Sequence, residues 1–359
     1  MHLIVGARPN FMKMAPLYRE LSLYSEKYEP LIIHTGQHYD EKMSKLFFYD
    51  LDMPKPAAYL NVGSASHGKQ TAMIMERYED LLLAGDKPDL VIVAGDVNST
   101  IACALVAKKL YIPVAHLEAG LRSYDDRMPE EINRVLTDRI SDILLTPSLD
   151  ANKNLEKEGI EPDKIYFVGN IMIDSLIAHK EKAETSNIFS NLNMLPKESY
   201  ALVTLHRPSN VDEYNSLKML LMALSEISGK IKIIFPMHPR TKKNIYELGL
   251  SSILNTSSNL IITEPLGYLD FLKLEMNSKF ILTDSGGIQE ESTYFGIPCL
   301  TLRENTERPI TITEGTNQIV DLNVESIVNS ATDIIEGKNK KGKIPKYWDG
   351  KTAARIVKV

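Results

Sequence analysis

The stretch that decides the fold is Tyr111–Arg134, YIPVAHLEAGLRSYDDRMPEEINR. Its first five residues, Tyr111–Ala115, form an apolar run that predicts a buried strand. A polar loop follows, and Pro129 predicts the start of a helix. Glu118 is therefore expected just beyond the carboxyl end of a strand, and Glu130 in the first turn of the next helix. Open α/β sheets bind their ligands at this edge, so the stretch predicts a functional site there.

A third acid, Asp96, follows the apolar run Leu90–Ala94, which predicts the preceding strand. Carboxyl groups gathered at one sheet edge suggest proton transfer. Each acid also has a structural interpretation. The helix dipole favours Glu130 in a first turn, and Glu118 could pair with Arg122. The three acids together favour catalysis over structural pairing.

Strands that are apolar throughout alternate with amphipathic helices in the first half of the chain, and the pattern restarts at Tyr200. Such strands indicate parallel sheets covered by helices on both faces. The length of 359 residues also favours two domains. We therefore predict an α/β fold of two doubly wound, Rossmann-like domains facing each other. Residues 1–173 form the first domain and residues 174–345 the second, while residues 346–359 form a helix that packs back across both.

The second strong motif is DSGGIQEE at 284–291, directly after the apolar run Phe280–Thr283. Ser285, Gly286 and Gly287 precede a helix, where backbone N–H groups can reach a phosphate. Helix capping alone explains the serine but not both glycines. Glu291 lies one helical turn further on and could accept hydrogen bonds from ribose hydroxyls. The motif therefore predicts a nucleotide site.

Other candidate ligand contacts lie at strand ends and helix starts. Arg8 and Lys13 flank a predicted helix N-terminus and favour an anion there, which by itself is a weak signal. His206 and His238 each follow a strand end beside an arginine, so we expect both to contact the ligand. Phe271 could stack on a base, although its helical spacing is more typical of core packing.

The composition excludes several classes of partner. A net charge of −6 leaves no basic excess for a nucleic acid, and no apolar run approaches the ~20 residues of a membrane span. The first residues, HLIVG, predict a strand and not a signal peptide, so we expect a cytoplasmic protein.

Cys103 and Cys299 lie in apolar runs and are expected as buried thiols. Motifs for a metal site or a serine nucleophile are missing, so we expect neither a metal nor a serine nucleophile.

Nine motifs are spread along the chain: GARPNFMK at 6–13, TGQH at 35–38, GDVNST at 95–100, HLEAGLRS at 116–123, MPEEINR at 128–134, TLHRP at 204–208, TDSGGIQEE at 283–291, RENTERP at 303–309 and WDGKTAARI at 348–356. Together they resemble the non-hydrolysing UDP-N-acetylglucosamine 2-epimerases, in order and over almost the whole chain. The resemblance implies a fold similar to the two-domain glycosyltransferases called GT-B, with the active site in the cleft between the domains. It also implies a UDP-sugar substrate, no cofactor and a homodimer.

The implied reaction inverts C2 of the sugar and gives UDP-N-acetylmannosamine, a precursor of surface polysaccharides. The C2 proton is removed as UDP leaves C1, and UDP adds back to the bound 2-acetamidoglucal after a proton arrives on the opposite face. Position by position, the resemblance assigns catalysis to Asp96, Glu118, Glu130 and His206. It assigns UDP or substrate contacts to Arg8, Lys13, Arg134, Phe271, Ser285, Gly286, Gly287 and Glu291.

Departures from this pattern leave the substrate open. Pro208 follows Arg207 where many bacterial members have a second arginine, and segments 35–48 and 62–68 differ from the loops that bind an activating second nucleotide in those enzymes. Segments 38–48 and 121–142 are more similar to a branch that acts on UDP-2,3-diacetamido-2,3-dideoxyglucuronate. We keep as alternatives a 2-epimerase of that nucleotide, a hydrolysing 2-epimerase and a GT-B glycosyltransferase.

Overall fold

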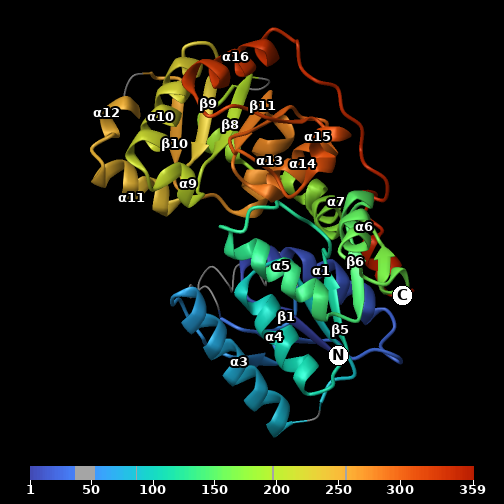
Figure 1. The fold of residues 1–359 in the computed structure, drawn as a ribbon. Helices are drawn as coiled ribbons and strands as arrows, with labels where there is room; N and C mark the ends of the chain where they lie inside the picture. Colours follow the sequence, from blue (N-terminus) through green and yellow to red (C-terminus); the bar gives the residue numbers. More distant parts are fainter. Residues whose placement is uncertain (37–52, 86, 196–197, 255–256) are drawn as a thin grey trace. The chain divides into compact units, whose positions relative to one another are not determined.

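The computed structural model describes residues 1–36, 53–85, 87–195, 198–254 and 257–359. Most of segment 35–48 therefore lies outside the described residues. The chain divides into two compact units, each described by itself. Unit 1 comprises Met1–Ser175 and Lys346–Val359, and unit 2 comprises Leu176–Pro345. Both units have the α/β architecture of helices around a parallel sheet (Figure 1).

The sheet of unit 1 runs in the order β3-β2-β1-β4-β5-β6-β7, and all its pairings are parallel. The strands are β1 (His2–Val5), β2 (Leu31–His34), β3 (Ala58–Tyr59), β4 (Val91–Ala94), β5 (Val114–Leu117), β6 (Ile143–Thr146) and β7 (Ile165–Phe167). The helices are α1 (Arg8–Ser22), α3 (His67–Ala84), α4 (Asn98–Lys109), α5 (Pro129–Ile140), α6 (Leu149–Lys157), the 3₁₀ turn η1 (Pro162–Lys164) and α17 (Thr352–Ile356). Helix α7 (Ile171–Glu184) contains the boundary between the two units.

The strand order of unit 1 reverses between β1 and β4. From β1 the chain winds outward to β2 and β3, and from β4 it winds the other way to β5, β6 and β7. Ligands of doubly wound sheets bind beyond the carboxyl ends of the strands at such a reversal. In unit 1 that place is occupied by Gly6–Ala7 after β1 and by Gly95–Asp96 after β4.

The sheet of unit 2 runs in the order β10-β9-β8-β11-β12-β13, also with parallel pairing. The strands are β8 (Tyr200–Thr204), β9 (Lys232–Pro236), β10 (Leu260–Thr263), β11 (Phe280–Thr283), β12 (Cys299–Thr301) and β13 (Asn317–Ile319). The helices are α8 (Ile188–Asn191), α9 (Pro208–Val211), α10 (Tyr214–Ser228), α11 (Pro239–Glu247), α12 (Ser251–Leu254), α13 (Tyr268–Asn277), α14 (Gly286–Phe295), α15 (Pro309–Thr313) and α16 (Val324–Ile335). Here the order reverses between β8 and β11, which end next to His206 and Asp284.

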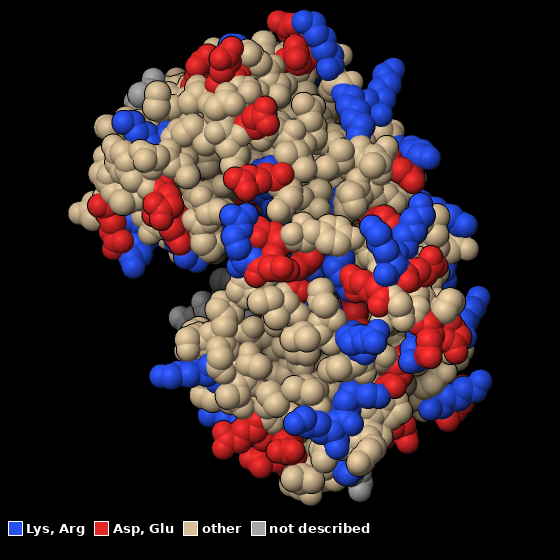
Figure 2. All heavy atoms as spheres, viewed as in Figure 1, with Lys and Arg blue, Asp and Glu red and all other residues tan. Residues whose placement is uncertain are grey.

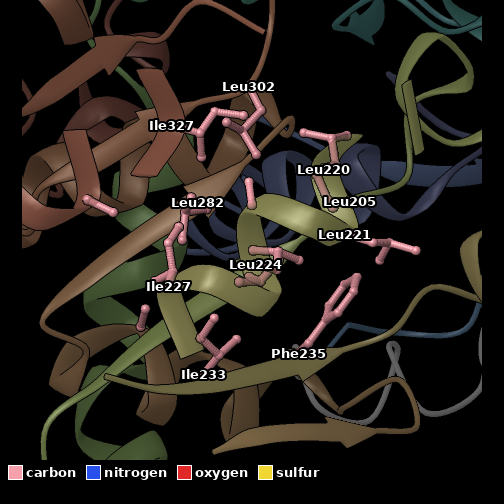
Figure 3. Close-up of a cluster of buried hydrophobic side chains, with 14 of the residues drawn as sticks. Leu205, Leu220, Leu221, Leu224, Ile227, Ile233, Phe235, Leu282, Leu302 and Ile327 are labelled. Carbon is pink, nitrogen blue, oxygen red and sulfur yellow. The ribbon is translucent and has the colours of Figure 1, made fainter. Parts of the chain in front are cut away.

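Apolar side chains fill both faces of the sheet in unit 2, because successive residues of a strand point to opposite faces. On β8, Ala201 and Val203 belong to one core cluster, while Tyr200 and Leu202 belong to another. Figure 3 shows part of the first cluster, in which leucines of α10 lie beside Ile233 and Phe235 of β9. The predicted doubly wound fold with helices on both faces is confirmed.

One predicted strand boundary is wrong. The apolar run Tyr111–Ala115 suggested a strand, but β5 begins only at Val114. Tyr111 has a positive φ of 61° and is 95% exposed, because it turns the chain out of α4. Pro113 has no N–H to donate to a ladder, although its carbonyl accepts the N–H of Val91 at 3.0 Å. Regular pairing therefore starts one residue later, with Val91 opposite Val114.

The last residues of the chain fold onto unit 1. The carboxylate of Asp174 accepts the N–H groups of Thr352 and Ala353 at 3.1 and 2.8 Å, at the start of α17. The indole N–H of Trp348, which is 2% exposed, donates to the carbonyl of Pro147 at 3.2 Å. These bonds tie a segment from the end of the sequence to β6 and α7 of unit 1.

The surface carries charges of both signs, and Figure 2 shows acidic and basic side chains interspersed on the face in view.

Both cysteines are buried free thiols, as predicted. Burial raises the pKa of the Cys103 thiol above its usual range, and burial also raises the pKa of Cys299 to about 12. Among the helices of the described chain, none is long and apolar enough to span a bilayer.

Candidate active site

Asp96 lies two residues beyond β4, with its side chain partly exposed, and it is bound by Arg134 of α5. The Nε and Nη2 groups of Arg134 donate to the same carboxylate oxygen at 3.0 and 2.7 Å. Arg134 also pairs with buried Glu131, whose carboxylate accepts the N–H groups of Ser123 and Tyr124 at 2.8–3.0 Å. Arg134 is thereby held between two acids, and its charge stabilises Asp96 as a carboxylate.

Glu118 follows β5, as predicted, and forms a buried ion pair with Lys13 of α1. Its backbone adopts a left-handed φ of 71°, which is uncommon for a residue with a side chain. Such strain is concentrated at functional sites. Gly95 leaves the room that the pair occupies, since a Cβ there would lie 2.7 Å from Lys13 Nζ and 3.2 Å from a Glu118 oxygen. The residue before Asp96 thus lies against the Lys13–Glu118 pair.

Glu130 lies in the first turn of α5, as predicted, one helical turn before Arg134. It is partly exposed, and among the described residues it has no ion-pair partner. The predicted pairing of Glu118 with Arg122 is wrong, because Glu118 pairs with Lys13 and Arg122 pairs with two other acids. Its guanidinium group donates to Glu158 at 2.7 Å through two N–H groups and contacts Asp138 at 2.7 Å.

A buried histidine holds the two acid-bearing loops together. His116 of β5 faces the Gly95 carbonyl with Nε2 at 2.8 Å and Asp138 of α5 with Nδ1 at 2.6 Å. The other oxygen of Asp138 accepts the N–H of Gly120 at 3.1 Å. Burial tends to raise the pKa of Asp138, but the charges and hydrogen bonds of His116 and Arg122 outweigh it and keep the pKa below its usual range. Asp138 is therefore a carboxylate that fixes both loops to α5.

In unit 2, His206 follows β8 and pairs with Asp284, which follows β11. Nδ1 of His206 is 2.9 Å from the Asp284 carboxylate, which also accepts the N–H groups of His206 and Arg207. Burial tends to raise the pKa of Asp284, but the His206 interactions and these N–H groups hold it below its usual range. The carboxylate orients the imidazole, whose side chain is 42% exposed, as in acid–base histidines.

His238 is the N-cap residue of α11, and its ring lies 5.9 Å from that of His206. Nδ1 of His238 accepts the N–H of Arg240 at 3.2 Å, which caps the helix. Partial burial lowers the pKa of His238, and the nearby His206 and Arg240 lower it further. His238 therefore caps the N-terminus of α11, and its exposed ring lies beside that of His206.

Ser285 is the N-cap residue of α14, and Gly286 and Gly287 are its first two residues. A Cβ on Gly286 would lie 2.6 Å from both Arg308 Nη1 and Glu307 Oε1, so packing within unit 2 explains this glycine. A Cβ on Gly287 would meet no described atom within 4 Å. Packing does not explain Gly287, whereas the approach of a ligand to the backbone would.

Glu291 lies on α14 and is 4% exposed, and the Tyr268 hydroxyl of α13 donates to it at 3.3 Å. Phe271, on α13, is partly buried against the apolar cluster that contains Leu202 and Ile281. Part of Phe271 thus belongs to the core, in line with the structural alternative for it. Arg8 is the first residue of α1, and its side chain is outside the described part of the structure.

The predicted residues form one group in each unit. Unit 1 contains Lys13, Asp96, Glu118, Glu130 and Arg134, which lie on α1, after β4, after β5 and on α5. Unit 2 contains His206, His238, Phe271, Ser285, Gly286, Gly287 and Glu291, which lie after β8, on α13, and at or within the starts of α11 and α14 or further along α14. Sequence reasoning missed the supporting residues Glu131, Asp138 and Asp284. Only Asp284 carried a usable signal, as the first residue of DSGG directly after a buried strand.

Comparisons with known proteins cover both units. The family model described as UDP-N-acetylglucosamine 2-epimerase matches residues 22–359. A Methanocaldococcus jannaschii protein named UDP-N-acetylglucosamine 2-epimerase is 46% identical over 362 residues, which cover 99% of this chain and 97% of that protein. The Pseudomonas aeruginosa UDP-2,3-diacetamido-2,3-dideoxy-D-glucuronate 2-epimerase is 40% identical over 357 residues, covering 99% of this chain and 97% of that protein. The crystal structure of the Methanocaldococcus jannaschii enzyme in complex with UDP-GlcNAc and UDP has a TM-score of 0.91 and 45% identity, covering 99% of this chain and 98% of that one.

Proposed function

The chain belongs to the UDP-N-acetylglucosamine 2-epimerase family, and from this premise we propose that it interconverts UDP-N-acetylglucosamine and UDP-N-acetylmannosamine without a cofactor. The enzyme is an isomerase of nucleotide sugars. The observation that carries the choice of substrate is the similarity of the whole chain to a structure that holds UDP-GlcNAc and UDP.

In the proposed reaction a carboxylate of unit 1 removes the proton from C2, the C1–O bond to UDP breaks, and 2-acetamidoglucal remains. A second acid then delivers a proton to the opposite face of C2 while an oxygen of UDP bonds to C1. The acids Asp96, Glu118 and Glu130 are the candidates for these transfers. What supports them is their place beyond β4, beyond β5 and at the start of α5, next to Lys13 and Arg134.

Departure of UDP places negative charge on the diphosphate, which needs hydrogen-bond donors and positive charge. The start of α14 offers backbone N–H groups and a favourable dipole. His206, oriented by Asp284, offers a proton near the same strand ends. We propose that these groups of unit 2 hold the nucleotide and that Glu291 binds its ribose.

The test is proton exchange at C2. Incubation with UDP-N-acetylglucosamine in deuterated water should place deuterium at C2 of both epimers, as read by mass spectrometry. Turnover without deuterium at C2 would contradict the elimination mechanism. Accumulation of UDP in proportion to free N-acetylmannosamine would indicate a hydrolysing enzyme, and turnover only with an added acceptor would indicate a glycosyltransferase.

A second candidate substrate is UDP-2,3-diacetamido-2,3-dideoxyglucuronate, because a relative named for that activity is 40% identical over the whole chain. Its extra carboxylate would need a cation that the N-acetylglucosamine nucleotide does not. Comparison of kcat/KM for the two nucleotides separates the candidates. A kcat/KM at least ~10-fold higher for the diacetamido nucleotide, about 1.4 kcal/mol in transition-state binding, would overturn our first choice.

We also propose that the enzyme is a homodimer in the cytoplasm. Helix α5 exposes an apolar strip of Ile132, Val135 and Leu136, which are 50, 39 and 50% exposed. Exposed apolar strips of this kind mark protein interfaces, and two buried free thiols are typical of a reducing compartment. Light scattering should give twice the chain mass for the native protein and the single-chain mass for Leu136→Glu. A native protein of single-chain mass would contradict the dimer.

A further inference from the structure

Glu275 of α13 is a buried carboxyl group that the proposed reaction does not use. Its exposed fraction is 0%, and neither of its oxygens meets an N–H or O–H donor in the described part of the chain. The polar group against it is another carboxylate, that of Glu291 on α14. Two acids thus touch in an apolar interior, with α13 and α14 packed together.

Two carboxylates in contact inside a protein cannot both be ionised, so the pair shares one proton. The hydroxyl of Tyr268 donates to Glu291 and stabilises a negative charge there. Glu275 has no such donor. Burial, and then the charge of Glu291, raises the pKa of Glu275 well above its usual range. The proton therefore resides on Glu275, which can donate it to Glu291.

We propose that Glu275 is a positioning residue, a neutral carboxylic acid whose O–H holds the carboxylate of Glu291 in place for the hydroxyls of a ribose. This rests on the proposed function, in which Glu291 binds the ribose of UDP. With Glu275 and Tyr268 both donating to it, the carboxylate of Glu291 is fixed before the nucleotide arrives. Pre-organisation of this kind raises affinity because less ordering is required on binding.

The same arrangement makes nucleotide binding depend on pH. Loss of the Glu275 proton would place a second negative charge beside Glu291 and repel it. Among the described residues, the Tyr268 hydroxyl on α13 and the Cys299 thiol on β12 are titratable groups near the pair, and the His179 ring on α7 lies against Tyr268, with ring centroids 5.8 Å apart. The thiol is neutral at ordinary pH, since the pKa of Cys299 is about 12.

The test compares two variants of the full-length enzyme. Glu275→Gln keeps a hydrogen-bond donor of nearly the same shape, whereas Glu275→Met fills the space without a donor. We expect UDP affinity, measured by calorimetry at neutral pH, to stay within ~3-fold in Glu275→Gln and to fall ~10-fold in Glu275→Met, the size of one positioned hydrogen bond. KM should rise in Glu275→Met while kcat changes little, and the alkaline loss of binding should disappear in Glu275→Gln.

Infrared spectroscopy tests the proton directly and without a nucleotide. The difference between the wild-type and Glu275→Gln spectra should contain the carbonyl band of a protonated carboxylic acid. A difference spectrum without that band, or a folded Glu275→Met enzyme that binds UDP as tightly as the wild type, would overturn the role of Glu275. A wild-type enzyme that shows the band but does not bind UDP would instead overturn the proposed function, and with it the ribose assignment.

Discussion

Lys13 and Glu118 form a buried ion pair that joins α1 to the end of β5, although they are 105 positions apart in the sequence. Lys13 is 4% exposed and Glu118 7%. A carboxylate at this depth needs a paired cation or several hydrogen-bond donors to remain charged. The pair therefore couples the helix after β1 to one of the three candidate catalytic acids.

We expect Lys13→Met to cost both stability and activity, because it leaves the charge of Glu118 buried without its partner. Removal of one member of a buried pair typically costs ~3–5 kcal/mol. Thermal unfolding and epimerase assays measure the two effects. Lys27→Met, which removes an exposed lysine, is the matched control and should change neither. A stable, active Lys13→Met enzyme would show that the ion pair is dispensable.

Asp96→Asn should abolish proton exchange at C2 while UDP still binds. The amide keeps the shape of the side chain and a hydrogen-bond acceptor for Arg134, but it cannot take or give the proton. General acid–base groups contribute ~10²–10⁴-fold, so we expect a fall in kcat of at least ~100-fold. Mass spectrometry of the sugar and calorimetry with UDP give the two readings. Asp126→Asn, at an exposed position, is the control. Normal exchange in Asp96→Asn would remove Asp96 from the reaction.

The two glycines at the start of α14 should respond differently to alanine. Gly286→Ala should lower the unfolding temperature, because its Cβ would collide with Arg308 and Glu307. Gly287→Ala should leave stability unchanged or raise it by up to ~1 kcal/mol, since alanine favours helices, but it should weaken UDP binding. Calorimetry of unfolding and of UDP binding separates the two effects. Equal UDP affinity in Gly287→Ala and the wild type would exclude a phosphate at this backbone.

Because of Asp284, the free energy of unfolding of the enzyme should fall at acid pH. Its pKa is lower in the folded protein than the ~3.9 of an unfolded aspartate, so its contribution is complete above pH ~4 and is lost as the pH falls through the folded pKa. Asp284→Asn should therefore be destabilised by ~1–3 kcal/mol at pH 6, with the difference from the wild type shrinking towards pH 2. Denaturant unfolding across this range tests it. A difference that does not depend on pH would contradict the role of the charge.

Glu275 should have the opposite dependence. Its pKa is raised above the ~4.3 of an unfolded glutamate, so its contribution to stability is present below pH ~4 and decreases as the pH rises towards the folded pKa. Glu275→Met should consequently gain stability relative to the wild type between pH 4 and pH 8. Unfolding temperatures at the two pH values measure the change. A constant difference between variant and wild type would show that Glu275 does not hold its proton.

The sequence pattern correctly predicted most of the polar residues that follow the strands. Asp96, Glu118 and Ser285 follow buried strands as expected, because continuous apolar runs in a parallel sheet end at one edge. The strand β5 begins later than the apolar run predicts, because Pro113 has no N–H to donate and Tyr111 adopts a positive φ. The partner of Glu118 was also misjudged, since Arg122 is near in sequence and Lys13 is not.

The alternation of apolar runs and helices was sufficient to establish two doubly wound units, because burial and backbone hydrogen bonding depend on local periodicity. It was also sufficient to place acids and glycines at strand ends. The folded chain alone settled which charges neutralise one another, such as Lys13 with Glu118, and which carboxyl group is buried without a hydrogen-bond donor among the described residues, namely Glu275. Ion pairing and the burial of a carboxyl group depend on which residues the sheets bring together. Separation along the sequence does not predict these neighbours.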